Sequence, residues 1–186
     1  MSPEIIVLTN PEELGINLPF GEEVVDFYLR IQEKEGIPPE NFWHFAANIF
    51  DNEGKIAIAT ENGKVVGIIA IKKPNREALI SQGIPPYPNL LFLCGFGLNT
   101  DFPFRVSRAL LEAILPENDN YLVVGLVSHN AKVYRRRIYS ALGFTEIPIE
   151  GYPYSYFCIE ADQLRETLDK RILSTVRKNR KGGELK

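Results

Sequence analysis

The chain has 186 residues, a length that fits one domain with a continuous core. Its hydrophobic fraction of 45% and charged fraction of 24% are typical of a globular protein and exclude a disordered or fibrous chain. With 21 Lys and Arg against 24 Asp and Glu, the net charge of -3 gives no overall field that would attract nucleic acid or an acidic membrane.

Cysteine usage and the N-terminus point to the same compartment. Cys94 and Cys158 lie in separate apolar runs and show neither a disulfide framework nor the spacing of a zinc site, so no metal is expected. No basic segment leads into an apolar one at the N-terminus, and no apolar run approaches the roughly 20 residues that span a bilayer. We therefore expect a cytoplasmic protein without an export signal or a membrane partner.

The first half of the chain predicts a strand, two helices and a hairpin. Apolar residues recur at helical spacing in both helices, and Pro38 or Pro39 is expected to start the second one. The hairpin is indicated by alternating residues on either side of a Glu-Asn-Gly turn. These elements are expected over Glu4–Leu8, Gly21–Glu35, residues 39–50, residues 56–60 and residues 65–71.

The second half predicts a long loop over residues 74–89, because its prolines leave no room for a regular element. Leu90–Leu98 then predicts a strand buried on both faces, in which Gly95 and Gly97 indicate a bulge or bend. The remaining elements are a helix, a strand, a helix, two strands and a last helix, expected over residues 107–115, 121–127, 130–142, 144–147, 154–159 and 161–176.

This order of elements, over roughly residues 4–160, resembles the GNAT superfamily of N-acetyltransferases. A more specific resemblance lies in NAKVYRRRIYSALGF, which ends at Phe144 and keeps Tyr139 five residues before the Phe of a Gly-Phe pair. The resemblance implies an α/β (α+β) fold, with a mixed, mostly antiparallel central sheet flanked by helices. It also implies a GNAT-like acyltransferase domain at residues 1–160, followed by a C-terminal helix and basic tail at residues 161–186.

The same resemblance implies acetyl-CoA as cosubstrate and Tyr139 as the general acid that protonates the departing coenzyme A thiolate. The role is chemically sound, because a phenol with a pKa of about 10 still carries its proton at neutral pH. The residues alone also allow a structural explanation, in which Gly143 stops a helix while Tyr139 and Phe144 pack in the core.

The loop that binds the cofactor pyrophosphate departs from the family pattern, Arg/Gln-X-X-Gly-X-Gly/Ala, whose small residues let backbone N–H groups approach the phosphates. Here FPFRVSRALLEAI begins with Phe102 in the polar position and has Arg105 and Ser107 in the two small positions. Either Arg105 and Arg108 hold the phosphates by charge, or the cofactor no longer binds and the fold serves another purpose. A solvated helix face would also explain both arginines.

Other cofactor contacts are implied with less support from the residues. A bend between Gly95 and Gly97 would free the N–H of Phe96 to polarise the thioester carbonyl. At 100° per residue, at least one arginine of residues 135–137 can reach a phosphate, whereas Asn130 also fits a helix N-cap. The implied cofactor-binding residues are Phe96, Leu98, Arg105, Val106, Ser107, Arg108, Asn130 and Arg135.

No general base emerges from the sequence, although the attacking amine must lose a proton. The buried strand offers Cys94 and no acid, and a cysteine in an apolar strand is usually inert. His44 and His129 both have structural explanations. The aromatic residues that could line an acceptor pocket, or equally form plain core, are Phe42, Trp43, Tyr152 and Tyr154, beside the loop at residues 85–88.

Two functions from different classes stay open at this stage. The first is an acyl-CoA-dependent N-acetyltransferase that acts on a small-molecule or peptide amine. The alternative is a catalytically inactive GNAT-like module that binds a protein partner through its C-terminal helix and basic tail. Nucleic-acid binding by residues 177–186 is not expected, because a short basic end is usually a solvated terminus. An oligomer is open.

Overall fold

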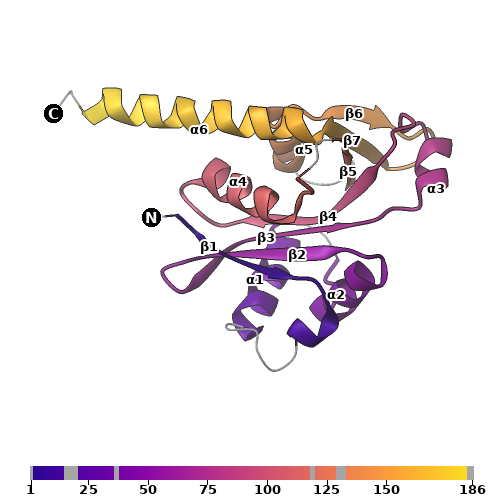
Figure 1. The fold of residues 1–186 in the computed structure, drawn as a ribbon, viewed down its shortest axis with the longest axis horizontal. Coiled ribbons are helices and arrows are strands. Elements are labelled where there is room, and N and C mark those ends of the chain that lie inside the picture. The colour runs from indigo at the N-terminus through magenta and orange to yellow at the C-terminus, as the bar shows by residue number, and fades with distance from the viewer. Residues whose placement is uncertain (1, 15–20, 36–37, 118–119, 129–132, 184–186) are drawn as a thin grey trace.

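The computed structural model describes residues 2–14, 21–35, 38–117, 120–128 and 133–183. In these residues, seven strands form one sheet with helices on both sides (Figure 1). The strands are β1 (Glu4–Leu8), β2 (Lys55–Glu61), β3 (Lys64–Lys72), β4 (Leu90–Leu98), β5 (Leu122–Ser128), β6 (Thr145–Pro148) and β7 (Tyr154–Glu160). The helices are η1 (Pro11–Leu14), α1 (Gly21–Glu35), α2 (Phe42–Asp51), α3 (Arg76–Ser81), α4 (Pro103–Ile114), α5 (Val133–Ala141) and α6 (Ala161–Gly183).

The sheet has the strand order β1-β2-β3-β4-β5-β7-β6, and every neighbouring pair is antiparallel except β4 and β5. The expected mixed, mostly antiparallel sheet is therefore confirmed. The expected hairpin is β2 and β3, whose turn places Asn62 and Gly63 at φ of 53° and 73°. Both lie in the left-handed region that Gly and Asn tolerate best, which explains why the Asn-Gly signal was reliable.

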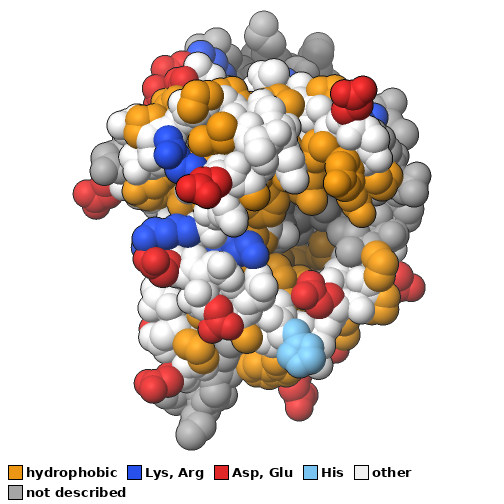
Figure 2. All heavy atoms as spheres, turned by 90° about the vertical axis from the view of Figure 1, so that its right-hand side faces the viewer, with side chains coloured by type: hydrophobic (Ala, Val, Ile, Leu, Met, Phe, Trp, Pro, Cys, Tyr) orange, Lys and Arg blue, Asp and Glu red, His pale blue; other side chains and the backbone are white. Residues whose placement is uncertain are grey.

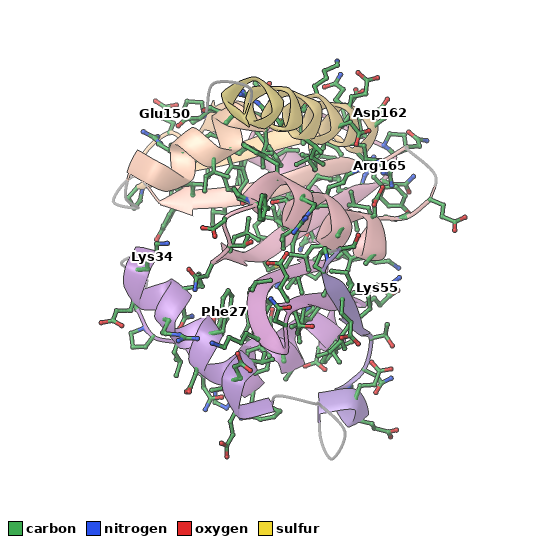
Figure 3. All side chains as sticks on the ribbon, turned by 90° about the vertical axis from the view of Figure 1, so that its left-hand side faces the viewer. Phe27, Lys34, Lys55, Glu150, Asp162 and Arg165 are labelled. Carbon is green, nitrogen blue, oxygen red and sulfur yellow. The ribbon has the colours of Figure 1, made fainter. Side chains whose placement is uncertain are left out.

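Both faces of the sheet are covered, because successive side chains of a strand point to opposite sides. On β2, Ala57 and Ala59 pack in the core beneath α4, while Ile56 and Ile58 pack in the core against α1 and α2. Figure 1 shows α1 and α2 on one side of the sheet, with α4 and α6 on the other. Figure 3 shows the side chains that fill both layers, including Phe27 of α1, which is 2% exposed.

The start of α2 differs from the expectation. The helix begins at Phe42 instead of a preceding proline, because the Asn41 side chain caps it and accepts a hydrogen bond of 2.8 Å from the Trp43 N–H. The start of α4 also differs from the expected residue 107, since Pro103 occupies the first helical position, where its missing N–H costs nothing.

The expected loop over residues 74–89 was wrong in part, since it contains α3. Asn75 caps this helix by accepting a 3.1 Å hydrogen bond from the Ala78 N–H. The prolines that argued for a loop, at residues 85–88, lie beyond the end of α3 and so do not interrupt it.

At the C-terminal end, α6 runs past the expected residue 176 to Gly183 and extends beyond the rest of the molecule (Figure 1). Its first turns are anchored, because Leu164 and Leu168 are 1% and 0% exposed in the same core that packs beneath α4. The division of the chain at residue 160 stays a prediction. Within the described ranges, no helix has both the length and the apolar character of a membrane span.

Candidate active site

The sheet opens into a fork where β4 and β5 separate. The two strands pair in parallel from Leu90 and Leu122 as far as Leu93 and Gly125, and the pairing then stops. Both strands continue, β4 to Leu98 and β5 to its own end three residues on. Beyond Leu93 and Gly125, the edges that face each other no longer pair, so their backbone groups are open to a ligand.

A β-bulge lies in β4 at the start of the fork. Ala70 pairs with Gly95 and Ile71 pairs with Leu93, which leaves Cys94 as the extra residue. The sequence predicts a bulge or bend in this strand, and the structure has the bulge one residue before the first of the two glycines.

The glycines of β4 serve the close packing of the helices. A Cβ atom at Gly95 would lie 2.9 Å from Cζ of Phe45, and one at Gly97 would lie 2.8 Å from Cγ1 of Ile31. Such distances are shorter than carbon atoms tolerate, so only glycine lets α1 and α2 approach the strand this closely.

Tyr139 lies at the opening of the fork on the opposite face. A Cβ atom at Gly125 would be 2.7 Å from Cε1 of Tyr139 and 2.8 Å from its hydroxyl oxygen, so the missing side chain makes room for the phenol. The ring is 5% exposed, and its centroid lies 4.7 Å from that of Phe144 and 5.3 Å from that of Phe157. Tyr139 is thus buried beside the last paired residue of β5.

The spacing between Tyr139 and Phe144 has a local cause. The N–H of Phe144 donates to the Tyr139 carbonyl at 3.0 Å, and the N–H of Gly143 donates to the Ser140 carbonyl at 3.1 Å. With Gly143 at a φ of 87°, these two bonds form a Schellman motif, which brings the residues at its two ends together. The structural and functional interpretations of Tyr139 are therefore compatible, since the helix stop also holds the ring at the fork.

The turn before α4 already balances its own charges. Nη2 of Arg105 lies 2.8 Å from Oε1 of Glu61, and its guanidinium carbon lies 4.6 Å from the ring centroid of Phe102. Oγ1 of Thr100 lies 3.3 Å from Oε2 of the same Glu61. Because Pro103 has no N–H, the first turn also offers a ligand fewer backbone donors than a small-residue loop would.

The other predicted residues of α4 are also committed to the protein. Arg108 places Nη2 2.8 Å from Glu112 and Nε 3.1 Å from Asp169, which ties α4 to α6. Val106 and Ser107 are 0% and 2% exposed, so only their backbone groups could contact a ligand. The structure does not bring these side chains to the fork.

The remaining predicted cofactor contacts lie on β4 and α5 and outside the described residues. Phe96 and Leu98 lie on β4 after its pairing with β5 has stopped, with Leu98 partly buried against the core beneath α4. Arg135 lies on α5, and Asn130 lies outside the described residues, as does His129.

A cavity of about 390 Å³ opens at the bulge, on the face of α1 and α2. Figure 2, which views the molecule from the right-hand side of Figure 1, shows a hollow with hydrophobic side chains above and below it. The polar residues that line the cavity are Tyr28, Gln32, Glu40, Asn48, Lys72 and Cys94. None of the four aromatic residues expected to line a pocket is among the lining residues, and Phe42 is instead core at 1% exposure.

Glu40 is the carboxylate that sequence reasoning missed. Its Oε2 accepts a hydrogen bond of 3.2 Å from the Tyr28 hydroxyl, and its own N–H donates to Oε1 of Gln32 at 2.9 Å. Burial, together with the charge of Glu40, raises the pKa of Tyr28. Nothing in the sequence around Glu40 marks it, since only the folding of α1 against α2 brings it to the cavity.

Cys94, at the bulge, is kept as a thiol by its surroundings. Burial raises its pKa to about 12, Lys72 lowers it and Glu40 raises it. A thiol with such a pKa is almost fully protonated at neutral pH, which agrees with its expected role as an inert residue.

Comparison with known proteins identifies the architecture. No protein-family model matches the sequence, and no curated protein matches it either. Among solved structures, an acetyltransferase from Thermus thermophilus is similar with a TM-score of 0.59 and 14% identity, over 86% of this chain and 97% of that one. A putative GNAT-family acetyltransferase from Desulfovibrio desulfuricans gives a TM-score of 0.52 and 14% identity, over 86% and 99%. The chain has the GNAT fold.

A third similar structure was determined with a ligand. It is the PaiA N-acetyltransferase from Thermoplasma acidophilum in complex with coenzyme A, with a TM-score of 0.52 and 13% identity, over 84% of this chain and 99% of that one. Identities this low support the GNAT fold alone. In this protein, Leu93 lies between the cavity at the bulge and the packed region around Tyr139, since it borders both.

Proposed function

We propose that this protein is an acyl-CoA-dependent N-acetyltransferase that transfers an acetyl group from acetyl-CoA to an amine. The observation that carries the proposal is the fork at Leu93 and Gly125, with the phenol of Tyr139 on one face and a cavity on the other. A thioester carbonyl in the fork would have a proton donor on one side and an amine on the other.

In the proposed reaction, the amine nitrogen attacks the thioester carbonyl carbon, and the C–S bond breaks as the carbonyl reforms. Tyr139 gives its phenolic proton to the departing thiolate and regains one from solvent. The backbone N–H of Phe96, beyond the bulge, is proposed to stabilise the negative charge on the carbonyl oxygen.

The cofactor phosphates are proposed to meet the start of α4, where the helix dipole is positive. The N–H groups of Phe104 and Arg105 precede the first intrahelical bond, from Val106 to Phe102, and are the donors available there. Arg105 contributes charge by exchanging its Glu61 partner for a phosphate. The N–H of Val106 is already used within α4, so Val106 and Ser107, like Leu98, Arg108, Asn130 and Arg135, remain proposed contacts without an assigned donor.

Calorimetric titration with acetyl-CoA tests the proposal. We expect micromolar binding, weakened about tenfold in Arg105→Ala by loss of one charge-assisted contact. Arg30→Ala, which removes an exposed arginine from α1 on the other face, is the matched control and should leave the affinity unchanged. No binding at millimolar acetyl-CoA would sink the transferase and favour the inactive, partner-binding module.

A further inference from the structure

Two opposite charges border the cavity at the bulge, Glu40 exposed and Lys72 half-buried, beside a largely apolar wall. Glu40 comes from the connection between α1 and α2, and Lys72 comes from the end of β3. Both residues line the cavity together with Cys94, the extra residue of the bulge.

Neither charge is neutralised by another residue that the structure describes. Glu40 accepts from the uncharged hydroxyl of Tyr28, and Nζ of Lys72 donates to Oδ1 of Asn48 at 2.6 Å. Across the ranges that the structure describes, neither side chain makes an ion pair. A ligand with one positive and one negative group would therefore satisfy both, through charge-assisted hydrogen bonds that a neutral ligand cannot make.

The rest of the wall selects for hydrocarbon. Part of the wall is formed by Tyr28, Phe45 and Ile68, which are 7%, 7% and 2% exposed. Phe92 of β4 and Leu126 of β5 line the same cavity. A volume of about 390 Å³ is at the small end of the usual range for ligand sites. Such a cavity suits a single small molecule with an apolar side group.

We propose that this cavity binds a free amino acid with an apolar side chain as the acetyl acceptor, its ammonium group on Glu40 and its carboxylate on Lys72. A peptide is disfavoured, because its N-terminal residue has an amide where Lys72 requires a carboxylate. That the amino acid accepts an acetyl group rests on the proposed function, whereas its binding in the cavity does not.

The same placement of the amino acid supplies a general base, which the sequence pattern alone did not reveal. Glu40 takes a proton from the bound ammonium group and passes it to solvent, which leaves a neutral amine with a free lone pair. The amine attacks the thioester carbonyl, a C–N bond forms and the C–S bond breaks. The nitrogen then loses its second proton to solvent, while the thiolate takes the proton of Tyr139.

The test measures binding of L-phenylalanine and L-leucine by calorimetry, with and without coenzyme A. Each amino acid is compared with the amine that lacks the carboxylate and the acid that lacks the amine: phenethylamine and 3-phenylpropionate, isopentylamine and 4-methylpentanoate. We expect at least one amino acid to bind about tenfold tighter than both of its analogues, because each analogue leaves one charge in the cavity unpaired.

Two variants separate the charges. Glu40→Gln should weaken the amino acid and the amine but not the acid, whereas Lys72→Met should weaken the amino acid and the acid but not the amine. The matched controls are Glu53→Gln and Lys73→Met, since these two residues form an exposed ion pair near the cavity's end of β3. The controls should change none of the affinities.

The outcomes separate this inference from the proposed function. If neither amino acid binds tighter than its analogues, or if Glu40→Gln and Lys72→Met weaken every probe alike, the inference is overturned. Acetyl transfer to phenethylamine as readily as to L-phenylalanine keeps the function and overturns the inference. Selective amino-acid binding without acetyl-CoA binding keeps the site and removes the transferase.

Discussion

The two sides of the fork differ in how their charged side chains are paired. On the α1–α2 side, Glu40 and Lys72 line the cavity, and among the described residues their side chains bond to the neutral groups of Tyr28 and Asn48. On the α4–α5 side, Arg105 pairs with Glu61, Arg108 pairs with two carboxylates, and Tyr139 is packed between aromatic rings.

This contrast indicates at which side a ligand would meet charges that are already paired. A ligand of the cavity meets a carboxylate and an ammonium group that can each gain a charged partner, whereas a phosphate at α4 meets an Arg105 that already carries Glu61 on Nη2. The proposed cofactor side is therefore already partly neutralised, and the proposed acceptor side is not.

The largest effect is expected at Tyr139. Tyr139→Phe removes the proton donor and keeps the ring, so acetyl transfer should slow about 100-fold, with little change in acetyl-CoA affinity. Steady-state and single-turnover rates measure this, and Tyr121→Phe, the same chemical change near the start of β5, should have no such effect. An unchanged rate would leave Tyr139 as a packing residue of the Schellman motif alone.

Cys94 gives the next largest effect, from the cavity side. At pH 8, a thiol with a pKa raised from 9.0 to about 12 has far less thiolate, and its greater intrinsic nucleophilicity recovers only part of the loss. Alkylation by iodoacetamide in a Cys158→Ala background should be about 30- to 50-fold slower than in the denatured chain. Its rate should still be rising above pH 9, where an ordinary thiol levels off. Fast labelling that levels off near pH 9 contradicts a desolvated bulge.

Gly97 tests how tightly α1 packs beside the cavity. Gly97→Ala places a Cβ atom 2.8 Å from Ile31, and we expect unfolding in urea to become about 1–3 kcal/mol easier. Ile31→Ala removes the opposing atoms, so the double variant should lose less free energy of unfolding than the two single variants lose in total. Strictly additive effects would show that α1 moves away from β4 at little cost.

The strands and the hairpin could be predicted from the sequence because their causes are local. β4 is continuously apolar, with Leu91 and Leu93 buried on one face and Phe92 and Cys94 half-buried on the other, and the β2–β3 turn needs residues that tolerate a positive φ. The Tyr139 signal is local too, since a Schellman motif fixes the distance between Tyr139 and Phe144 along the chain. By contrast, α3 was missed because nearby prolines outweighed the cap at Asn75.

The chemistry of the cavity could not be predicted, because it depends on residues distant in the chain. Glu40 meets Tyr28 twelve residues away, and Lys72 meets Asn48 twenty-four residues away. Arg105 meets Glu61 across forty-four residues, so its charge looks free in the sequence and is balanced in the structure. No motif encodes such pairs, since the sheet and its helices create them.

The smallest effect, at Glu61, decides between the two explanations of Arg105. Glu61→Gln keeps a side chain of the same size that can still bond Thr100, but it releases Arg105 from an ion pair with side chains 37% and 22% exposed. Because a partly exposed pair contributes little, the gain should be modest: about three- to tenfold tighter acetyl-CoA binding. The gain should vanish in Glu61→Gln combined with Arg105→Ala, and calorimetry on the four proteins measures the coupling. Tighter binding that persists without Arg105 would mean that Glu61 acts only by repelling the phosphates, whereas no change in either background would mean that Arg105 serves the turn and not the cofactor.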